Sequence, residues 1–162
     1  MSRFRLALAS LALLAVASPT LAAEGRPFQL ALVNPVQIVP EGESISGVRL
    51  TLIYTKNRDV TGLDLSFIAA HATGNFTGVQ WALVGLADGN LLGWQANAVN
   101  LTGKTMRGLQ SGLFNKAGRV EGLQFGLVNV AGTINGLQIG LVNVIQQGGW
   151  LPVMVLVNGH FD

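Results

Sequence analysis

The sequence predicts an all-β fold: a parallel β-solenoid of about nine repeats of 14–16 residues that follows a cleaved signal peptide. Three observations predict it. A glycine-led motif returns at nearly constant spacing, the residues inside each copy alternate with the period of a β-strand, and charged residues make up only 11% of the chain. So low a charge favours stacked strands over a helical bundle, whose outer surface usually carries many charges.

The N-terminal segment predicts a secretory signal peptide. Two arginines precede an apolar run over 6–17, and a Ser-Pro break then leads to the small residues before Ala22. The run is too short for a transmembrane helix and is followed by a plausible cleavage site. We therefore expect residues 1–22 to be removed and residues 23–162 to form a single β-repeat domain.

Loss of the signal peptide changes the charge balance of the chain. The sequence holds 10 basic and 8 acidic residues, and Arg3 and Arg5 belong to the signal, so 10 − 2 = 8 basic residues remain against 8 acidic ones. A nearly neutral chain lacks the positive surface that nucleic-acid binding needs, so we expect no nucleic-acid partner. The chain has no cysteine and hence no disulfide framework.

The repeat is clearest near the C-terminal end of the chain. The units GLQFGLVN and GLQIGLVN begin at Gly122 and Gly136, 14 residues apart. The segments 28–34 and 152–158 fit the pattern as first and last copies. Weaker copies precede the clear ones at steps of 14–16 residues, starting at Gly47, Gly62, Gly78, Gly93 and Gly108.

Within each copy, large apolar residues alternate with Gln and with small residues. Leu123, Phe125 and Leu127, for example, are interleaved with Gln124. Period-two alternation predicts a strand with one buried face, and we expect the large apolar columns to point inward. A further apolar position, such as Ile134, precedes each glycine.

Two columns of the repeat are candidate functional or structural sites. In a parallel coil equivalent residues stack on one another, so recurring amides can form a structural ladder. The ladder candidates are Asn100, Asn115, Asn129, Asn143, Gln110, Gln124 and Gln138. A second column directly follows an apolar residue that we expect to be buried. Strict alternation points it outward as an apolar interface, whereas a bend in the chain turns it into a core corner. This column contains Val84, Val99, Phe114, Val128 and Val142.

The alternative fold is an up-and-down outer-membrane β-barrel with one copy per strand. Successive barrel strands run in opposite directions, so a barrel sequence should repeat over two strands, whereas this sequence repeats over one. The prolines beyond the signal all lie in or beside the first and last copies. Proline is confined to sheet edges, which an open stack has and a closed barrel lacks. Both points favour the solenoid.

The GLQFGLVN and GLQIGLVN units resemble those of bacterial surface-repeat proteins, an exported group of unknown function. The stretch from Trp150 to Val153 is similar to the closing segment of that group. The resemblance implies a location in the envelope or on the cell surface, and it implies no catalytic residues. The glycine-containing 14-residue spacing is more loosely similar to the head repeats of trimeric autotransporter adhesins, and adhesin function does not carry over from it.

The sequence contains no recognisable constellation for catalysis or metal binding. His71 and His160 have no second histidine or carboxylate at ligand spacing, and Glu41 and Glu43 lie in a Pro-Glu-Gly-Glu-Ser loop. No serine lies in a nucleophile motif, and no glycines form a phosphate loop that leads into a helix. We therefore expect no catalytic residue, no metal and no cofactor.

These observations predict an exported, non-enzymatic envelope or surface repeat protein with a structural or binding role. We expect it in the periplasm, the outer membrane or on the surface of a bacterium. The expected partners are further copies of the chain or other envelope components. Basic residues in the turns, such as Lys104 and Lys116, could contact the outer-membrane surface. The alternative function, tied to the barrel, is a small outer-membrane pore or an envelope-stability factor.

Overall fold

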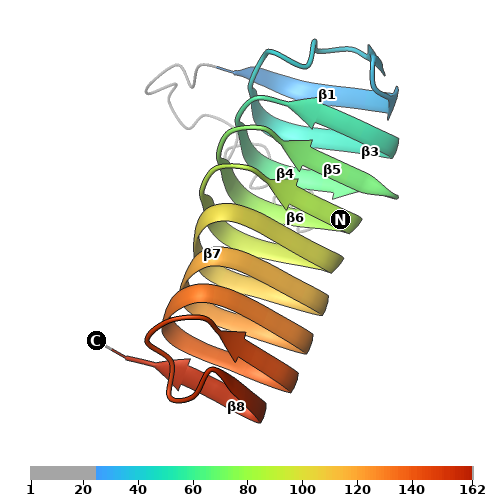
Figure 1. The fold of residues 1–162 in the computed structure, drawn as a ribbon. Helices are drawn as coiled ribbons and strands as arrows, with labels where there is room; N and C mark the ends of the chain where they lie inside the picture. Colours follow the sequence, from blue (N-terminus) through green and yellow to red (C-terminus); the bar gives the residue numbers. More distant parts are fainter. Residues whose placement is uncertain (1–24, 162) are drawn as a thin grey trace, which may run out of the picture.

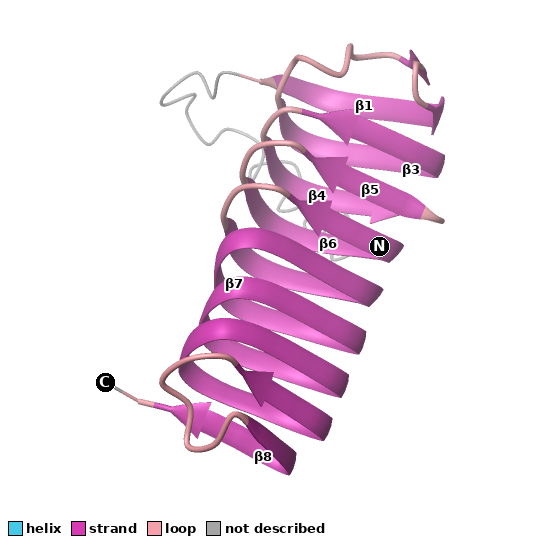
Figure 2. Ribbon diagram, viewed as in Figure 1, coloured by secondary structure: helices cyan, strands magenta, loops and turns pink. Residues whose placement is uncertain are grey.

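The computed structural model describes residues 25–161, so the expected signal peptide, residues 1–22, lies outside the described residues. Strands dominate this part of the chain, and it contains no helix (Figure 2). The elements in chain order are β1 (Arg26–Val33), β2 (Val36–Gln37), β3 (Ile45–Asn57), β4 (Val60–Ser66), β5 (Ala69–Ala72), β6 (Phe76–Ala87), β7 (Leu91–Ile145) and β8 (Val153–His160).

Neighbouring strands run parallel, in a register that repeats once per coil. Gly47 pairs with Gly62, Gly62 with Gly78, and Gly78 with Gly93. Strand β7 winds continuously through several coils of the same shape, and the coils stack along one axis (Figure 1). The parallel β-solenoid is thus confirmed. The alternative of an up-and-down barrel is wrong, because neighbouring strands of such a barrel are antiparallel.

Each coil has two sides joined by a corner. The first side, which we call the glycine side, carries the strand segment that follows the glycine, and the second side carries segments such as β5 and the end of β6. The two sides enclose a thin interior. The glycine side consists of the segments 28–32, 48–52, 63–67, 79–83, 94–98, 109–113, 123–127 and 137–141.

The glycine that opens each repeat is required by both its backbone conformation and its surroundings. Gly62 has a φ of 122° and Gly136 a φ of 148°, a region that side chains disfavour. A Cβ on Gly62 would also lie 2.0 Å from the carbonyl oxygen of Gly47, one coil earlier. The glycines therefore stack directly on one another, and this close approach sets the start of every coil.

The two ends of the stack differ in a way that corrects the repeat count. Strand β1, the first copy, pairs parallel with β3 as expected, and β2 folds back antiparallel on β1. The last copy, 152–158, does not form a parallel coil, because β8 runs antiparallel to β7. The chain reverses in the preceding turn, where Gly148 has a φ of 74°. The stack therefore has fewer coils than the nine copies expected, and a reversed strand covers each end.

The interior is apolar along one edge and polar along the rest. The apolar part is built from the position before each glycine together with small residues of the second side. These residues form one cluster of buried side chains: Val39, Ile45, Val60, Ala72, Phe76, Ala87, Leu91, Met106, Ala117, Val120, Ala131, Ile134 and Ile145. Beside this cluster, the Gln and Asn columns fill the space between the two sides of the coil.

The expected orientation of the glycine-side strands is therefore wrong. The Gln column points inward, and the large apolar columns point to solvent, with Phe125 57% exposed and Gln124 fully buried. The apolar positions Ile134 and Leu137 are three residues apart, so period-two alternation places them on opposite sides of the strand. Ile134 faces inward. Room decides the rest: a Cβ on Gly126 would lie 2.5 Å from Nδ2 of Asn115, so this interior has no space for large side chains.

Candidate functional site

A ladder of glutamine amides runs through the interior parallel to the stacking axis. Nε2 of Gln138 donates to Oε1 of Gln124, which donates in turn to Gln110, each at 2.8 Å. The ladder continues from Gln110 to Gln95 at 2.8 Å and from Gln95 to Gln80 at 2.9 Å. All of these side chains are fully buried. Every donor points toward the N-terminal end of the stack.

A second ladder, of asparagine amides, runs beside the first with the opposite polarity. Nδ2 of Asn100 donates to Oδ1 of Asn115 at 2.7 Å, and the bonds from Asn115 to Asn129 and from Asn129 to Asn143 measure 2.8 Å. Each of these amides also donates to a backbone carbonyl, as Asn129 does to Ile139 at 3.0 Å. The donors point toward the C-terminal end, so the amide dipoles of the two ladders oppose each other.

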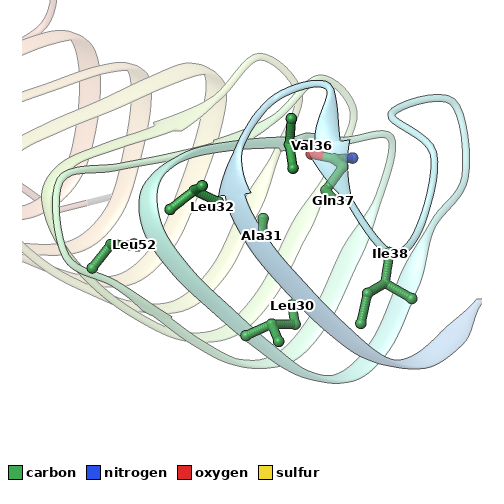
Figure 3. A pocket seen from close by; sticks show the side chains of 7 residues that line it. All are labelled: Leu30, Ala31, Leu32, Val36, Gln37, Ile38 and Leu52. Carbon is green, nitrogen blue, oxygen red and sulfur yellow. The ribbon is translucent and has the colours of Figure 1, made fainter.

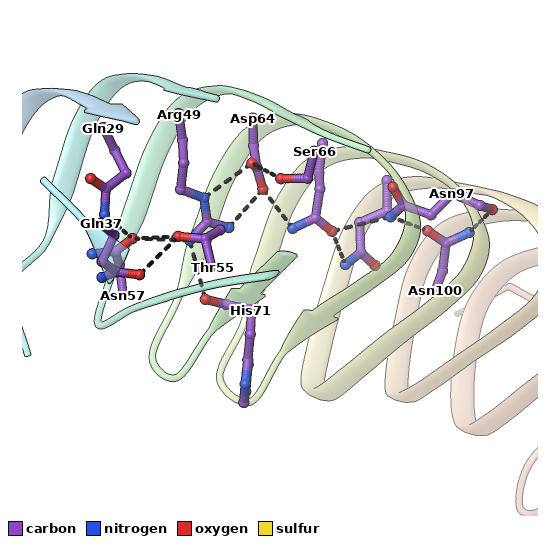
Figure 4. Close-up of polar contacts among 12 residues, drawn as sticks. Gln29, Gln37, Arg49, Thr55, Asn57, Asp64, Ser66, His71, Asn97 and Asn100 are labelled. Carbon is purple, nitrogen blue, oxygen red and sulfur yellow. Dashed lines mark hydrogen bonds and ion pairs between the residues drawn. The ribbon is translucent and has the colours of Figure 1, made fainter. Parts of the chain in front are cut away.

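The N-terminal end of the Gln ladder is a buried ion pair (Figure 4). Gln80 donates to Oδ2 of Asp64 at 2.9 Å, and Arg49 donates to the same carboxylate through Nη2 at 2.6 Å and Nε at 3.0 Å. Ser66 adds a fourth donor at 3.1 Å. Both charged side chains are fully buried. The carboxylate is a pure acceptor that ends the run of donors, and Arg49 balances its charge inside the protein.

The residues Arg49 and Asp64 occupy the Gln column, and the sequence pattern did not single them out. Their signal was present: two opposite charges stand in successive repeats at a position otherwise held by Gln. At the opposite end, Oε1 of Gln138 is buried and has no hydrogen-bond partner among the described residues. It is the last acceptor of the ladder, and no further Gln follows it.

The outer surface of the glycine side is a continuous apolar face. Its outward side chains are the first, third and fifth residues of each glycine-side segment, and Ser111 is the only one with a polar side chain apart from the indoles of Trp81 and Trp94. Leu52 is 54%, Trp81 57% and Leu141 59% exposed. The hydroxyl of Ser111 accepts a hydrogen bond from Nε1 of Trp94 at 2.8 Å. We call this surface the apolar face.

The candidate interface column lies at the corner beside the apolar face. Val84, Val99, Phe114 and Val128 are partly exposed, and Val142 is exposed. The next residue along, Asn143, is fully buried, so two consecutive outward residues, Leu141 and Val142, mark the bend of the chain. The column thus borders the apolar face and widens it. It does not belong to the buried apolar cluster.

Shallow depressions lie near both ends of the apolar face. The first, about 470 Å³, lies between β1 and the returning segment, where Leu30 and Leu32 face Val36 and Ile38 (Figure 3). The second, about 460 Å³, lies where Leu156 of β8 adjoins the last coils. Both are lined almost wholly by apolar side chains and open to solvent, so they suit apolar contacts more than the orientation of a polar substrate.

The second side of the coil carries a short polar relay on its outer surface. Nδ1 of His71 lies 3.0 Å from the Tyr54 hydroxyl, and Nε2 of His71 lies 2.9 Å from Oδ2 of Asp88. Burial raises the pKa of Tyr54. Local spacing alone gave His71 no partner; stacking supplies one, because residues 17 apart sit on adjacent coils. Three such groups in a row can pass a proton, but none of the pockets described above includes them.

The charged residues of the turns largely pair with one another. Arg107 and Arg119 both pair with Glu121, Arg26 with Glu43 and Arg58 with Asp59. The hydrogen bond from Arg107 is the main cause that lowers the pKa of Glu121. Within residues 25–161, no group of three or more His, Cys, Asp or Glu side chains is arranged to hold a metal ion. No helix in that range is long and apolar enough to cross a membrane.

Comparison with known proteins adds no relative to this description: no family model, no curated protein and no solved structure matches the chain.

Proposed function

We propose that this protein is an exported, non-enzymatic component of the bacterial cell envelope whose solenoid serves as a structural and binding surface. The observation that carries the proposal is the apolar face, which extends over every coil of the stack. Monomeric proteins rarely expose apolar patches larger than a few hundred Å², and larger ones mark sites of interaction. The interior of the solenoid is closed by paired amides, so the outer surface is where a partner can act.

The export part of the proposal rests on the N-terminal segment. The apolar run over 6–17 and the small residues before Ala22 are typical of a secretory signal. The resemblance of the GLQIGLVN units to exported surface-repeat proteins supports the same location. The signal peptide has the composition that a bacterial export system recognises, and a location in the periplasm, the outer membrane or on the cell surface follows from it.

Cell fractionation combined with N-terminal sequencing tests the proposal. The full chain is expressed in a Gram-negative bacterium, and we expect a product that begins at residue 23 or 24 and is recovered with the periplasm or the membranes. A variant with Leu11→Arg and Leu14→Arg interrupts the apolar run and should stay uncleaved in the cytoplasm. Cytoplasmic recovery of the unaltered chain with Met1 intact would refute the export proposal.

A further inference from the structure

We propose that the apolar face is a self-association surface: two copies of the chain pack face to face with antiparallel solenoid axes, related by a two-fold axis between the segments 79–83 and 94–98. This inference deepens the proposed function by naming the partner of the apolar face. Four features of the face carry it: its size, its dry chemistry, the character of its rim and the order of large and small residues along it.

The size of the apolar face matches a stable protein interface. Strands lie about 4.8 Å apart and residues rise about 3.3 Å along a strand, so the stacked segments form a surface of roughly 35 by 17 Å, or about 600 Å². Its corrugated accessible area is larger than this flat footprint. A standard interface covers about 800 Å² on each partner. The column from Val84 to Val142 extends the face at the corner and brings it closer to that size.

The chemistry of the face suits a dry contact between two sheets. The hydroxyl of Ser111 and the indole of Trp94, two of its few polar groups, are already hydrogen-bonded to each other at 2.8 Å. They therefore lose little when water is excluded, because a buried polar group is costly only when it is unpaired. Sheets that pack through apolar side chains lie about 10 Å apart, a spacing that this flat surface permits.

The rim of the face favours a protein partner over an anionic lipid surface. Peripheral membrane binding usually combines apolar insertion with unpaired basic residues around it. Here Arg107, which precedes the face in its coil, pairs with Glu121 of the next coil, and Arg26 pairs with Glu43. A rim of paired opposite charges gives little attraction to phosphate groups. It is compatible with the rim of another copy of the same chain.

The order of side chains along the face selects the antiparallel arrangement. A two-fold axis along the strand direction, midway between 79–83 and 94–98, places Trp81 of one copy opposite Ala96 of the other. It also places Leu83 opposite Ala98. Large residues then fill the space left by small ones, as in a well-packed core. A parallel arrangement would instead oppose Trp81 to Trp81 and Ala96 to Ala96, with a clash beside a void. Two-fold dimers are also the commonest homo-oligomers.

The first test measures association in the absence of detergent. Sedimentation velocity of the purified protein should show a dimer at micromolar concentration. Ala96→Arg places a charge beside the axis and should raise the dissociation constant at least about 30-fold, as for a central interface residue. Val130→Arg is the matched control, since Val130 is partly exposed on the second side, in a column that already holds Lys116. This control should remain dimeric, and both variants should keep the far-UV circular dichroism of the parent.

The second test determines the arrangement by crosslinking, which the lack of cysteine makes clean. The two-fold axis places Leu65 opposite Ser111 of the other copy, so a tagged Leu65→Cys chain mixed with an untagged Ser111→Cys chain should crosslink with a short bismaleimide. Leu65→Cys alone should crosslink poorly, because its two equivalents are three strands, about 14 Å, apart along the stack. Crosslinking of Leu65→Cys to itself would overturn the antiparallel arrangement.

The remaining outcomes separate this inference from the proposed function. A monomer in detergent-free buffer, or a dimer that survives Ala96→Arg, would overturn self-association through the apolar face. Monomers that float with vesicles of phosphatidylethanolamine and phosphatidylglycerol would assign the face to lipid instead. None of these results would alter the export proposal, which depends on cleavage and fractionation. Cytoplasmic recovery of an uncleaved chain would overturn that proposal and leave the dimer result standing.

Discussion

Asn129 lies in the middle of the Asn ladder and makes all of its side-chain hydrogen bonds inside the protein. Its Oδ1 accepts from Asn115 at 2.8 Å, and its Nδ2 donates to Asn143 at 2.8 Å and to the carbonyl of Ile139 at 3.0 Å. Asn129→Ala removes three bonds that contribute about 1 kcal/mol each and leaves Oδ1 of Asn143 without its donor. We expect the free energy of unfolding to fall by about 3–5 kcal/mol.

The Asn143→Ala variant and the double variant turn this prediction into a test of the contact itself. The two single changes remove the same Asn129–Asn143 bond, so the double variant should lose about 1–2 kcal/mol less than the sum of the two losses. Urea unfolding followed by far-UV circular dichroism and by tryptophan fluorescence gives these values, provided that the two transitions coincide. Asn135→Ala is a matched control, since Asn135 is only partly buried. It should change stability by less than about 0.5 kcal/mol.

Additivity is the result that would refute the ladder. If the losses of the two single variants summed within about 0.5 kcal/mol, the two amides would not be coupled. A loss of less than about 1 kcal/mol for Asn129→Ala would be equally damaging, because a side chain with three buried hydrogen bonds cannot be removed so cheaply. Either outcome would leave the glycine column and the apolar cluster as the main supports of the coil stack.

Three further predictions follow from other parts of the solenoid. Gly122→Ala should abolish folding or lower the melting temperature steeply, because its Cβ would lie 2.2 Å from a carbonyl oxygen of the preceding coil at a φ of 143°, whereas Gly42→Ala, with nothing within 4 Å of its Cβ, should be tolerated. Arg49→Met should cost about 3–5 kcal/mol by leaving Asp64 buried and unpaired, and the double variant Arg49→Gln with Asp64→Gln should recover most of that loss as two more amide rungs; no recovery in urea unfolding would contradict the ladder model. The raised pKa of Tyr54 means that burial favours its neutral form, so this contribution to stability is complete below pH 10.0 and is lost as the pH rises through the folded-state pKa; ultraviolet titration should give a midpoint above 10.0, and a midpoint below that value would argue against burial.

The parallel stacking was predictable because it leaves a direct mark on the chain. Equivalent positions lie above one another, so the same residue types suit each coil, and the sequence repeats over one copy. The glycine at each copy start marks a backbone that side chains cannot adopt, as at Gly136 with its φ of 148°. The amides that recur at fixed spacing, Asn129 and Asn143 among them, lie within hydrogen-bond distance for the same reason.

The last copy shows where a residue pattern stops being informative. The segment 152–158 matches the repeat in composition, yet β8 runs antiparallel to β7. Strand direction depends on the turn that precedes the strand, and apolar alternation is the same for both directions. The conformation of Gly148, with a φ of 74°, reverses the chain there, and a single glycine among many does not reveal this.

The sequence by itself determined that the chain forms stacked parallel coils, because the repeat spacing, the glycine at the start of each copy and the period-two alternation are local properties. Only the tertiary structure decided which side of each strand faces inward. Ile134 and Leu137 are an odd number of residues apart, so local alternation permits either choice. Contacts between coils settle it: the amides of Gln124 and Asn129 pair with their equivalents in the thin interior, the large apolar side chains do not fit there, and the solenoid turns them outward as the apolar face.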